Sequence, residues 1–239
     1  MEGLTALRTV LASQWCICSV LVLERKLGAI ASIGLPTGVP VYLVTEEIMA
    51  ATAGFDVHRG VLAAAKRPGT RHLHEVLSAA RPGCPIVVAE DLNDQENLGS
   101  LFRNSAAFGA GAVVLSPACA DPLYRRTVRV SLGLVTRVPF CRAEVWPGAL
   151  DEIRSHGYEL VALTPAPDAG PIGRVAAEIG EQPVALVLGA EGPGLSASAM
   201  AKCHRARIPM SGGVDSLNVA AATAVGLFCF TQGVGKGGA

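Results

Sequence analysis

The chain has 239 residues, and its 20 lysines and arginines balance 20 aspartates and glutamates, so the formal net charge is zero. Half of the residues are hydrophobic and 17% are charged, which excludes a disordered chain and permits a sizeable buried core. A neutral chain binds nucleic acid only through a local basic patch. The seven cysteines lack metal-ligand spacing, and the longest apolar run, 219–230, is too short to span a bilayer. We expect a cytoplasmic protein with no metal site and no membrane segment.

Short apolar segments alternate with helical patterns in the first 80 residues. Strands are expected at 15–23 and 39–44, which are rich in β-branched residues and bounded by glycine, proline or charged residues. A helix is expected at 45–52, where Thr45 can cap the first turn and two glutamates favour its N-terminus. Residues 64–83 are basic and carry Pro-Gly at both ends, which predicts a linker that contains one helix.

Beyond residue 80 the alternation becomes more regular, with short apolar strands that are each followed by a loop and a helical pattern. These strands are expected at 85–89, 112–115, 159–163, 183–188 and 205–210. Strands that are apolar on both faces and separated by helices predict a parallel α/β sheet. Ligands of such sheets bind beyond the carboxyl ends of the strands, so the loops after residues 89, 188 and 210 are the candidate site.

The loop after residue 89 leads into a helix with polar residues near its start. Asn97 can cap this helix, and Gly99 and Arg103 lie four residues apart on one face. The glycine would let another chain or a ligand come close while the arginine projects across the gap. A solvated arginine on an ordinary amphipathic helix explains the same pattern.

The other two loops are rich in glycine. LGAEGPGLS (188–196) exposes backbone groups around Glu191, although a simple tight turn has the same composition. SGGVDS (211–216) has the residues of the phosphate-binding loop of ATP pyrophosphatases and lies between a strand and a helix. Only residues 217–239 follow it, and these are too few to complete that nucleotide fold. This position argues against a pyrophosphatase.

Together, the three loops resemble the motifs of the SpoU (TrmH-like) family of RNA ribose 2′-O-methyltransferases, within the SPOUT class. The motif Asn-x-Gly-x-x-x-Arg is matched by Asn97, Gly99 and Arg103. The second motif is matched by Gly189, Glu191, Gly192 and Gly194, and the third by Ile-Pro-Met at 208–210 and Ser-Leu-Asn at 216–218. Each motif alone is weak, but three in order, each after an expected strand, are specific.

The resemblance implies a fold and a division into two domains. Residues 81–239 are expected to form an α/β catalytic domain with a mostly parallel sheet and a C-terminal trefoil knot. Residues 1–80 are expected to form a small α/β domain that binds the RNA substrate. Relatives usually have a segment before the point that matches Met1, so either the first strand of this domain is missing or the start of the sequence is misassigned.

The resemblance also implies S-adenosylmethionine as the methyl donor, RNA (ribosomal or transfer) as the partner, and a homodimer in which the partner chain supplies a site residue. The residues expected to hold the cofactor are Leu188, Gly189, Ile208, Met210, Leu217 and Asn218. Arg103 is expected to be catalytic, with the site organised by Asn97, Glu191, Ser216 and Asn218. Deprotonating an arginine near pH 7 costs about 7 kcal/mol. We therefore expect Arg103 to grip phosphate and stabilise the developing alkoxide instead of acting as the general base.

RNA binding needs a basic surface, and one segment is rich enough in arginine to provide it. Residues 103–142 contain six arginines and one aspartate. Arg125, Arg126 and Arg129 are expected to contact phosphates, and the basic residues of the 64–83 linker would extend the patch. A solvated helix face is the alternative for this cluster.

Two other classes of function are open to the sequence. A catalytically inactive RNA-binding or ribosome-assembly protein on the same fold would keep the fold but not the cofactor. A nicotinamide dehydrogenase fits less well, because no Gly-x-Gly-x-x-Gly follows an early strand. The motifs specify neither the RNA nor the nucleotide that is methylated.

Overall fold

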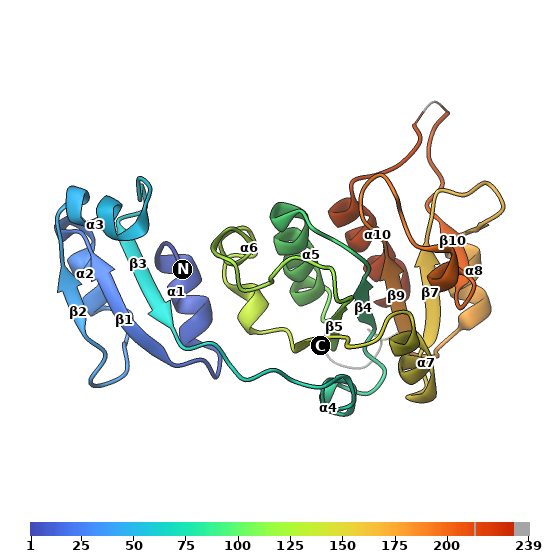
Figure 1. The fold of residues 1–239 in the computed structure, drawn as a ribbon, viewed down its shortest axis with the longest axis horizontal. Helices are drawn as coiled ribbons and strands as arrows, with labels where there is room; N and C mark the ends of the chain where they lie inside the picture. The colour runs from blue at the N-terminus through green and yellow to red at the C-terminus, as the bar shows by residue number, and fades with distance from the viewer. Residues whose placement is uncertain (213, 232–239) are drawn as a thin grey trace.

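Two α/β units joined by an extended segment make up the chain (Figure 1). The computed structural model describes residues 1–212 and 214–231. The N-terminal unit has a three-stranded sheet of order β2-β1-β3, and the C-terminal unit has a seven-stranded sheet of order β6-β5-β4-β9-β7-β10-β8. Within the described residues, no helix combines the length and the apolar composition needed to cross a membrane.

The N-terminal unit pairs two parallel strands with a third, antiparallel one. Its elements are α1 (Leu4–Leu11), β1 (Ile17–Val22), the 3-10 turn η1 (Glu24–Lys26), α2 (Leu27–Ala31), β2 (Val41–Leu43), α3 (Glu46–Ala53) and β3 (Val61–Ala65). The backbone N–H of Ile48 donates to Thr45 Oγ1 at 3.4 Å, so α3 begins at the predicted cap. The end of β3 lies inside the predicted linker, because a strand of valine, leucine and alanine next to basic residues carries little β signal.

The C-terminal unit confirms the predicted parallel α/β sheet. Its strands are β4 (Ile86–Ala89), β5 (Ala112–Leu115), β6 (Phe140–Arg142), β7 (Glu159–Leu163), β8 (Gly170–Pro171), β9 (Val184–Leu188) and β10 (His204–Arg207). Every pair of neighbouring strands is parallel. The helices and the 3-10 turn are α4 (Leu73–Ala79), α5 (Gln95–Ala107), α6 (Arg125–Val130), η2 (Leu134–Thr136), α7 (Gly148–Ser155), α8 (Ile172–Ile179), α9 (Ala197–Met200) and α10 (Val219–Thr231). The strand predicted at 205–210 is β10, and it ends at Arg207. Ile208 and Met210 therefore lie in the loop that follows this strand.

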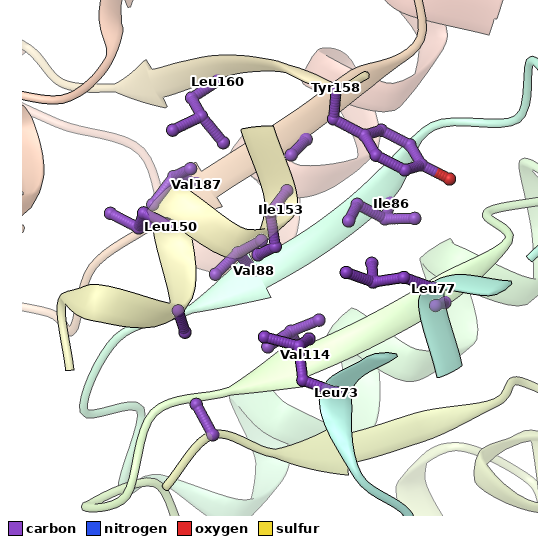
Figure 2. Close-up of a cluster of buried hydrophobic side chains, with 14 of the residues drawn as sticks. Leu73, Leu77, Ile86, Val88, Val114, Leu150, Ile153, Tyr158, Leu160 and Val187 are labelled. Atoms are coloured by element: carbon purple, nitrogen blue, oxygen red, sulfur yellow. The ribbon is translucent and has the colours of Figure 1, made fainter. Parts of the chain in front are cut away.

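Helices cover both faces of the large sheet, which explains why its central strands are apolar throughout. On one face, α4 and α7 pack against alternate residues of β4 and β5, including Ile86, Val88 and Val114 (Figure 2). On the other face, α5 and α10 cover the intervening residues, such as Val87 and Val113. Because α4 contributes Leu73, Val76 and Leu77 to this core, we propose that the division between the units falls before Leu73.

Arginines of the large unit contact the small one. The Arg125 guanidinium lies 3.7 Å from the centre of the Phe55 ring and donates to the carbonyl oxygen of Ala53 at 3.2 Å. Arg67 of the connecting segment pairs with Asp121 at 2.6 Å. Gly133, at φ 80°, lies so close to α1 that an added Cβ would be 3.0 Å from the carbonyl oxygen of Ala6. These contacts bring residues distant in sequence together across the junction.

Candidate functional site

The loops after β9 and β10 meet at one edge of the sheet. Parallel pairing places the end of β4 beside the end of β9, with Ala89 opposite Leu188. A pocket of about 630 Å³ opens there, within the range typical of small-molecule sites. It is lined by the end of β7, by the loop after β9, by the loop after β10 and by the start of α10.

Glycines determine the shape of the loop after β9. A Cβ added at Gly189 would overlap the backbone of Gly194, so the loop closes on itself only with glycine at position 189. Gly192 and Gly194 have φ values of 86° and 70°, in the left-handed region that glycine adopts without strain. The loop therefore presents backbone groups to the pocket where side chains would otherwise fill it.

Asn218 connects the three motif loops by hydrogen bonds. Its Nδ2 donates to Asn97 Oδ1 at 2.8 Å and to Glu191 Oε1 at 2.7 Å. Its Oδ1 accepts the backbone N–H of Ala220 at 2.9 Å, at the start of α10. One amide thus joins the start of α5, the glycine-rich loop and the start of α10. Removing it would leave Asn97 and Glu191 without this shared donor.

The predicted role of Asn97 as a helix cap is wrong. Helix α5 begins one turn earlier, where Asp94 Oδ1 accepts the backbone N–H of Asn97 at 2.7 Å. A carboxylate satisfies a free N–H group at a helix start and interacts favourably with the helix dipole, so Asp94 is the better cap. This placement leaves the Asn97 side chain free to reach Asn218.

Gly99 and Arg103 lie one turn apart on α5, and Gly99 is buried against α6. A Cβ at Gly99 would be 2.8 Å from Val130 Cβ and 2.9 Å from the carbonyl oxygen of Thr127, so this glycine allows α6 to pack closely. Arg103 is exposed, and within the described residues its guanidinium has neither a hydrogen bond nor an ion pair. It lies about 9 Å further along the helix axis than Asn97 and does not line the pocket.

The other predicted site residues divide into two groups. All of those expected to hold the cofactor line the pocket, as do Glu191 and Ser216. The three arginines expected to contact RNA are already engaged. Arg126 Nη2 lies 2.7 Å from Glu96 Oε1, and Arg129 Nη1 lies 3.7 Å from Oε2 of the buried Glu2. The Arg125 guanidinium lies over the Phe55 ring. Their contact with RNA stays a prediction.

Sequence reasoning missed Glu90, a carboxylate with 3% of its surface exposed at the end of β4. Its Oε2 accepts the backbone N–H of Ser196 at 2.8 Å, and its Oε1 accepts the indole N–H of Trp146. Ser196 ends the glycine-rich loop, so Glu90 anchors that loop to the sheet. The available signal was an acidic residue placed directly after an apolar strand.

The variant Glu90→Gln is expected to lower the free energy of unfolding by about 1–3 kcal/mol, because one buried N–H would then face the new amide N–H₂. The loosened loop should also bind the cofactor more weakly. Urea unfolding and cofactor titration measure the two effects. Glu181→Gln is the matched control, since Glu181 is exposed. An unchanged unfolding free energy for Glu90→Gln would contradict the anchoring role.

Two cysteines, Cys141 and Cys203, stay protonated at neutral pH. Burial raises the pKa of the Cys141 thiol to about 12 and that of the Cys203 thiol to about 11. A thiol is nucleophilic only as the thiolate, so neither residue is suited to accept a methyl group. Within the part of the chain that the structure describes, histidine, cysteine and acidic residues form no group of three able to hold a metal ion.

Comparisons with known proteins identify the family. Residues 85–228 match the family model described as the SpoU rRNA Methylase family. Over 228 residues the chain is 41% identical to an uncharacterized tRNA/rRNA methyltransferase of Mycobacterium bovis, covering 95% of this chain and 78% of the relative. The AdoMet-bound rRNA methyltransferase from Sinorhizobium meliloti matches with a TM-score of 0.82 at 26% identity, over 97% of this chain and 86% of that one.

A solved RNA 2′-O ribose methyltransferase also matches, with a TM-score of 0.77 at 26% identity, over 98% of this chain and 87% of that one. The similarity to these two structures extends over both α/β units. The family model covers more than half of the chain, including all three glycine- and asparagine-bearing loops. The chain therefore belongs to the SpoU rRNA methylase family.

Proposed function

We propose that this protein transfers a methyl group from S-adenosylmethionine to a ribose 2′-hydroxyl of ribosomal or transfer RNA. The observation that carries the proposal is the hydrogen-bonded group of Asn97, Asn218 and Glu191, which joins three family motifs beside one pocket. The Sinorhizobium meliloti relative is AdoMet-bound and another relative is a 2′-O ribose methyltransferase, which supports the same cofactor and the same acceptor here.

The chemistry of the pocket fits S-adenosylmethionine. Leu188, Ile208, Met210 and Leu217 provide apolar contact for an adenine ring. The carboxylates of Glu191 and Asp215 line the same pocket and complement the cationic sulfonium and ammonium groups. Backbone groups of the loop that Gly189 shapes can bond to the polar edge of the ligand. The bound cofactor would supply an electrophilic methyl group.

The chain contributes orientation and charge to the reaction. Asn218 bonds to Glu191 in the pocket lining and to Asn97 at the start of α5, and Ser216 adds a hydroxyl to the lining. Fixing the reacting groups in this way supplies a large part of a rate enhancement. Arg103 would bind the phosphate next to the acceptor ribose and stabilise the oxygen as it loses its proton.

We further propose that the protein is a homodimer, with a trefoil knot formed by the loops after β9 and β10. Helix α10 is apolar all round, and a helix of this kind is normally buried. Here, however, Val225 and Phe228 are 36% and 52% exposed. A second copy that covers this face would bury both side chains. Arg103, which is exposed on α5, would then be the residue that one copy contributes to the partner's pocket.

The variant Phe228→Glu is expected to shift the protein from dimer to monomer in light scattering at micromolar concentration, because a buried, unpaired charge in an apolar interface is costly. Activity should fall with the dimer. Val145→Glu is the control, since Val145 is 69% exposed and lies away from α10, between β6 and α7. A wild-type protein that is monomeric and fully active would reject the dimer.

Calorimetric titration of the purified protein with S-adenosylmethionine tests the cofactor part of the proposal. We expect one molecule bound per chain, with the same affinity before and after treatment with a chelator. Absence of binding would favour the alternative of an inactive RNA-binding protein on this fold. Loss of binding or of activity in the chelator would contradict a metal-free reaction.

A further inference from the structure

A second cleft, with a volume of about 810 Å³, lies between the two units. One wall is formed by residues 12–15, which follow α1, and by the connecting segment 67–71. The other wall is formed by the segments around β5, η2 and β6, which is the edge strand of the large sheet. Figure 1 shows the connecting segment running from β3 to α4 along one side of the junction. The cleft is separate from the pocket at Asn218.

The cleft is strongly basic. Four arginines line it, against one acidic residue, Asp121. Arg67 is paired with Asp121, and Arg142 is committed to the carbonyl oxygens of the loop after β5, to which it donates at 2.7–3.1 Å. Arg71 and Arg137 remain. Both are exposed, and within residues 1–212 and 214–231 neither guanidinium has a hydrogen bond or an ion pair.

An aromatic side chain accompanies these two free cations. Trp15 lies in the turn after α1, packs its inner side against the core of the small unit and is only partly buried. Trp15 lines the same cleft as Arg71 and Arg137. Cations that bind phosphates, beside an aromatic ring on which a base stacks, are the combination that proteins use for single-stranded nucleic acid. The volume of the cleft suits individual nucleotides rather than a double helix.

We propose that this cleft binds a single-stranded stretch of the substrate RNA, with Arg71 and Arg137 on phosphates and Trp15 stacked against a base. The inference rests on the proposed function, since RNA is the substrate there. It assigns the RNA contact to the junction of the two units, whereas Arg125 and Arg129 of α6 contact the small unit. The cleft would fix the orientation of the RNA strand relative to the pocket at Asn218.

The test compares Arg71→Glu/Arg137→Glu with a matched control, Arg25→Glu/Arg174→Glu. The control makes the same change in charge at two exposed arginines, one in each unit, whose surface ion pairs contribute little to stability. Binding of a fluorescein-labelled, unstructured 20-nucleotide RNA and of a duplex of equal length is followed by anisotropy at several salt concentrations. Cofactor titration and thermal melting show that each variant is folded.

We expect the Arg71/Arg137 variant to bind the single strand at least about tenfold more weakly than the control, with a salt slope smaller by about 1.4, as two lost phosphate contacts require. Trp15→Ala should weaken binding about tenfold, and Trp15→Phe should weaken it much less, because phenylalanine still stacks. Single-strand binding equal to that of the control, in variants that still bind cofactor, would overturn the inference alone. Preference of the wild type for the duplex would also overturn it.

If the wild-type protein binds the cofactor but binds neither the single-stranded nor the duplex RNA, the result would contradict the proposed RNA substrate. It would then also contradict the assignment of the cleft.

Discussion

Arg103→Ala is expected to lower kcat by about 100- to 1,000-fold, the effect of removing one donor that stabilises a developing oxyanion. Cofactor affinity should change little, because Arg103 does not line the pocket in which the cofactor is expected to bind. Arg103→Lys keeps the charge but loses the two-pronged guanidinium, so its kcat should fall less. Arg174→Ala, an exposed arginine on α8, is the control and should retain full activity.

A comparison of Arg103→Lys with the wild type distinguishes a charged clamp from a general base. A lysine has a pKa of about 10.4, well below that of arginine. If the residue accepts the proton, the pH–rate profile of Arg103→Lys should shift to lower pH by a unit or more. If the residue acts through its charge, the profile should keep its wild-type position while the rate falls. Steady-state kcat measured against pH for the wild type and for Arg103→Lys decides between the two roles.

Gly189→Ala is expected to weaken cofactor binding about tenfold to a hundredfold, with a loss of about 1–3 kcal/mol in the free energy of unfolding. The added Cβ would overlap the backbone of Gly194, and a backbone atom cannot move aside as the end of a side chain can. The loop would have to open, which displaces the groups that line the pocket. Calorimetric titration and urea unfolding measure the two losses.

Gly173→Ala provides the control for this substitution. Gly173 lies in α8, and a Cβ added there meets no atom within 4 Å. Alanine favours a helix by about 1 kcal/mol over glycine, so this variant should bind cofactor normally and be slightly more stable. Equal behaviour of the two alanine variants would show that the closure of the 189–194 loop is not required for binding.

The parts of the fold that the sequence predicts are those with a local signal. Strands that are apolar on both faces predict the parallel sheet. Thr45 and the two glutamates that come directly after it predict the start of α3. The loops after β9 and β10 could be assigned to one site, because parallel strands end at one edge. The sequence did not predict the strands β3, β6 and β8, since short strands at the edge of a sheet show weak periodicity.

The parts of the site that the sequence did not predict depend on contacts between residues that lie far apart in the chain. Asn97 and Asp94 are both good caps, and only the observed hydrogen bonds show that Asp94 takes this role and Asn97 reaches Asn218. The burial of Glu90 depends on Trp146 and Ser196, which lie 56 and 106 residues away along the chain. Likewise, no local pattern indicates that Arg125 packs on Phe55 of the small unit.

Transfer of a labelled methyl group tests the proposed activity most directly. The purified protein is incubated with methyl-labelled S-adenosylmethionine and with ribosomal and transfer RNA from cells that lack the gene, and the RNA is then digested to nucleosides for mass spectrometry. We predict that the label appears in one 2′-O-methylated nucleoside and that Arg103→Ala nearly abolishes it. Label on a base, or no label in RNA from a protein that binds the cofactor, would contradict the proposed function.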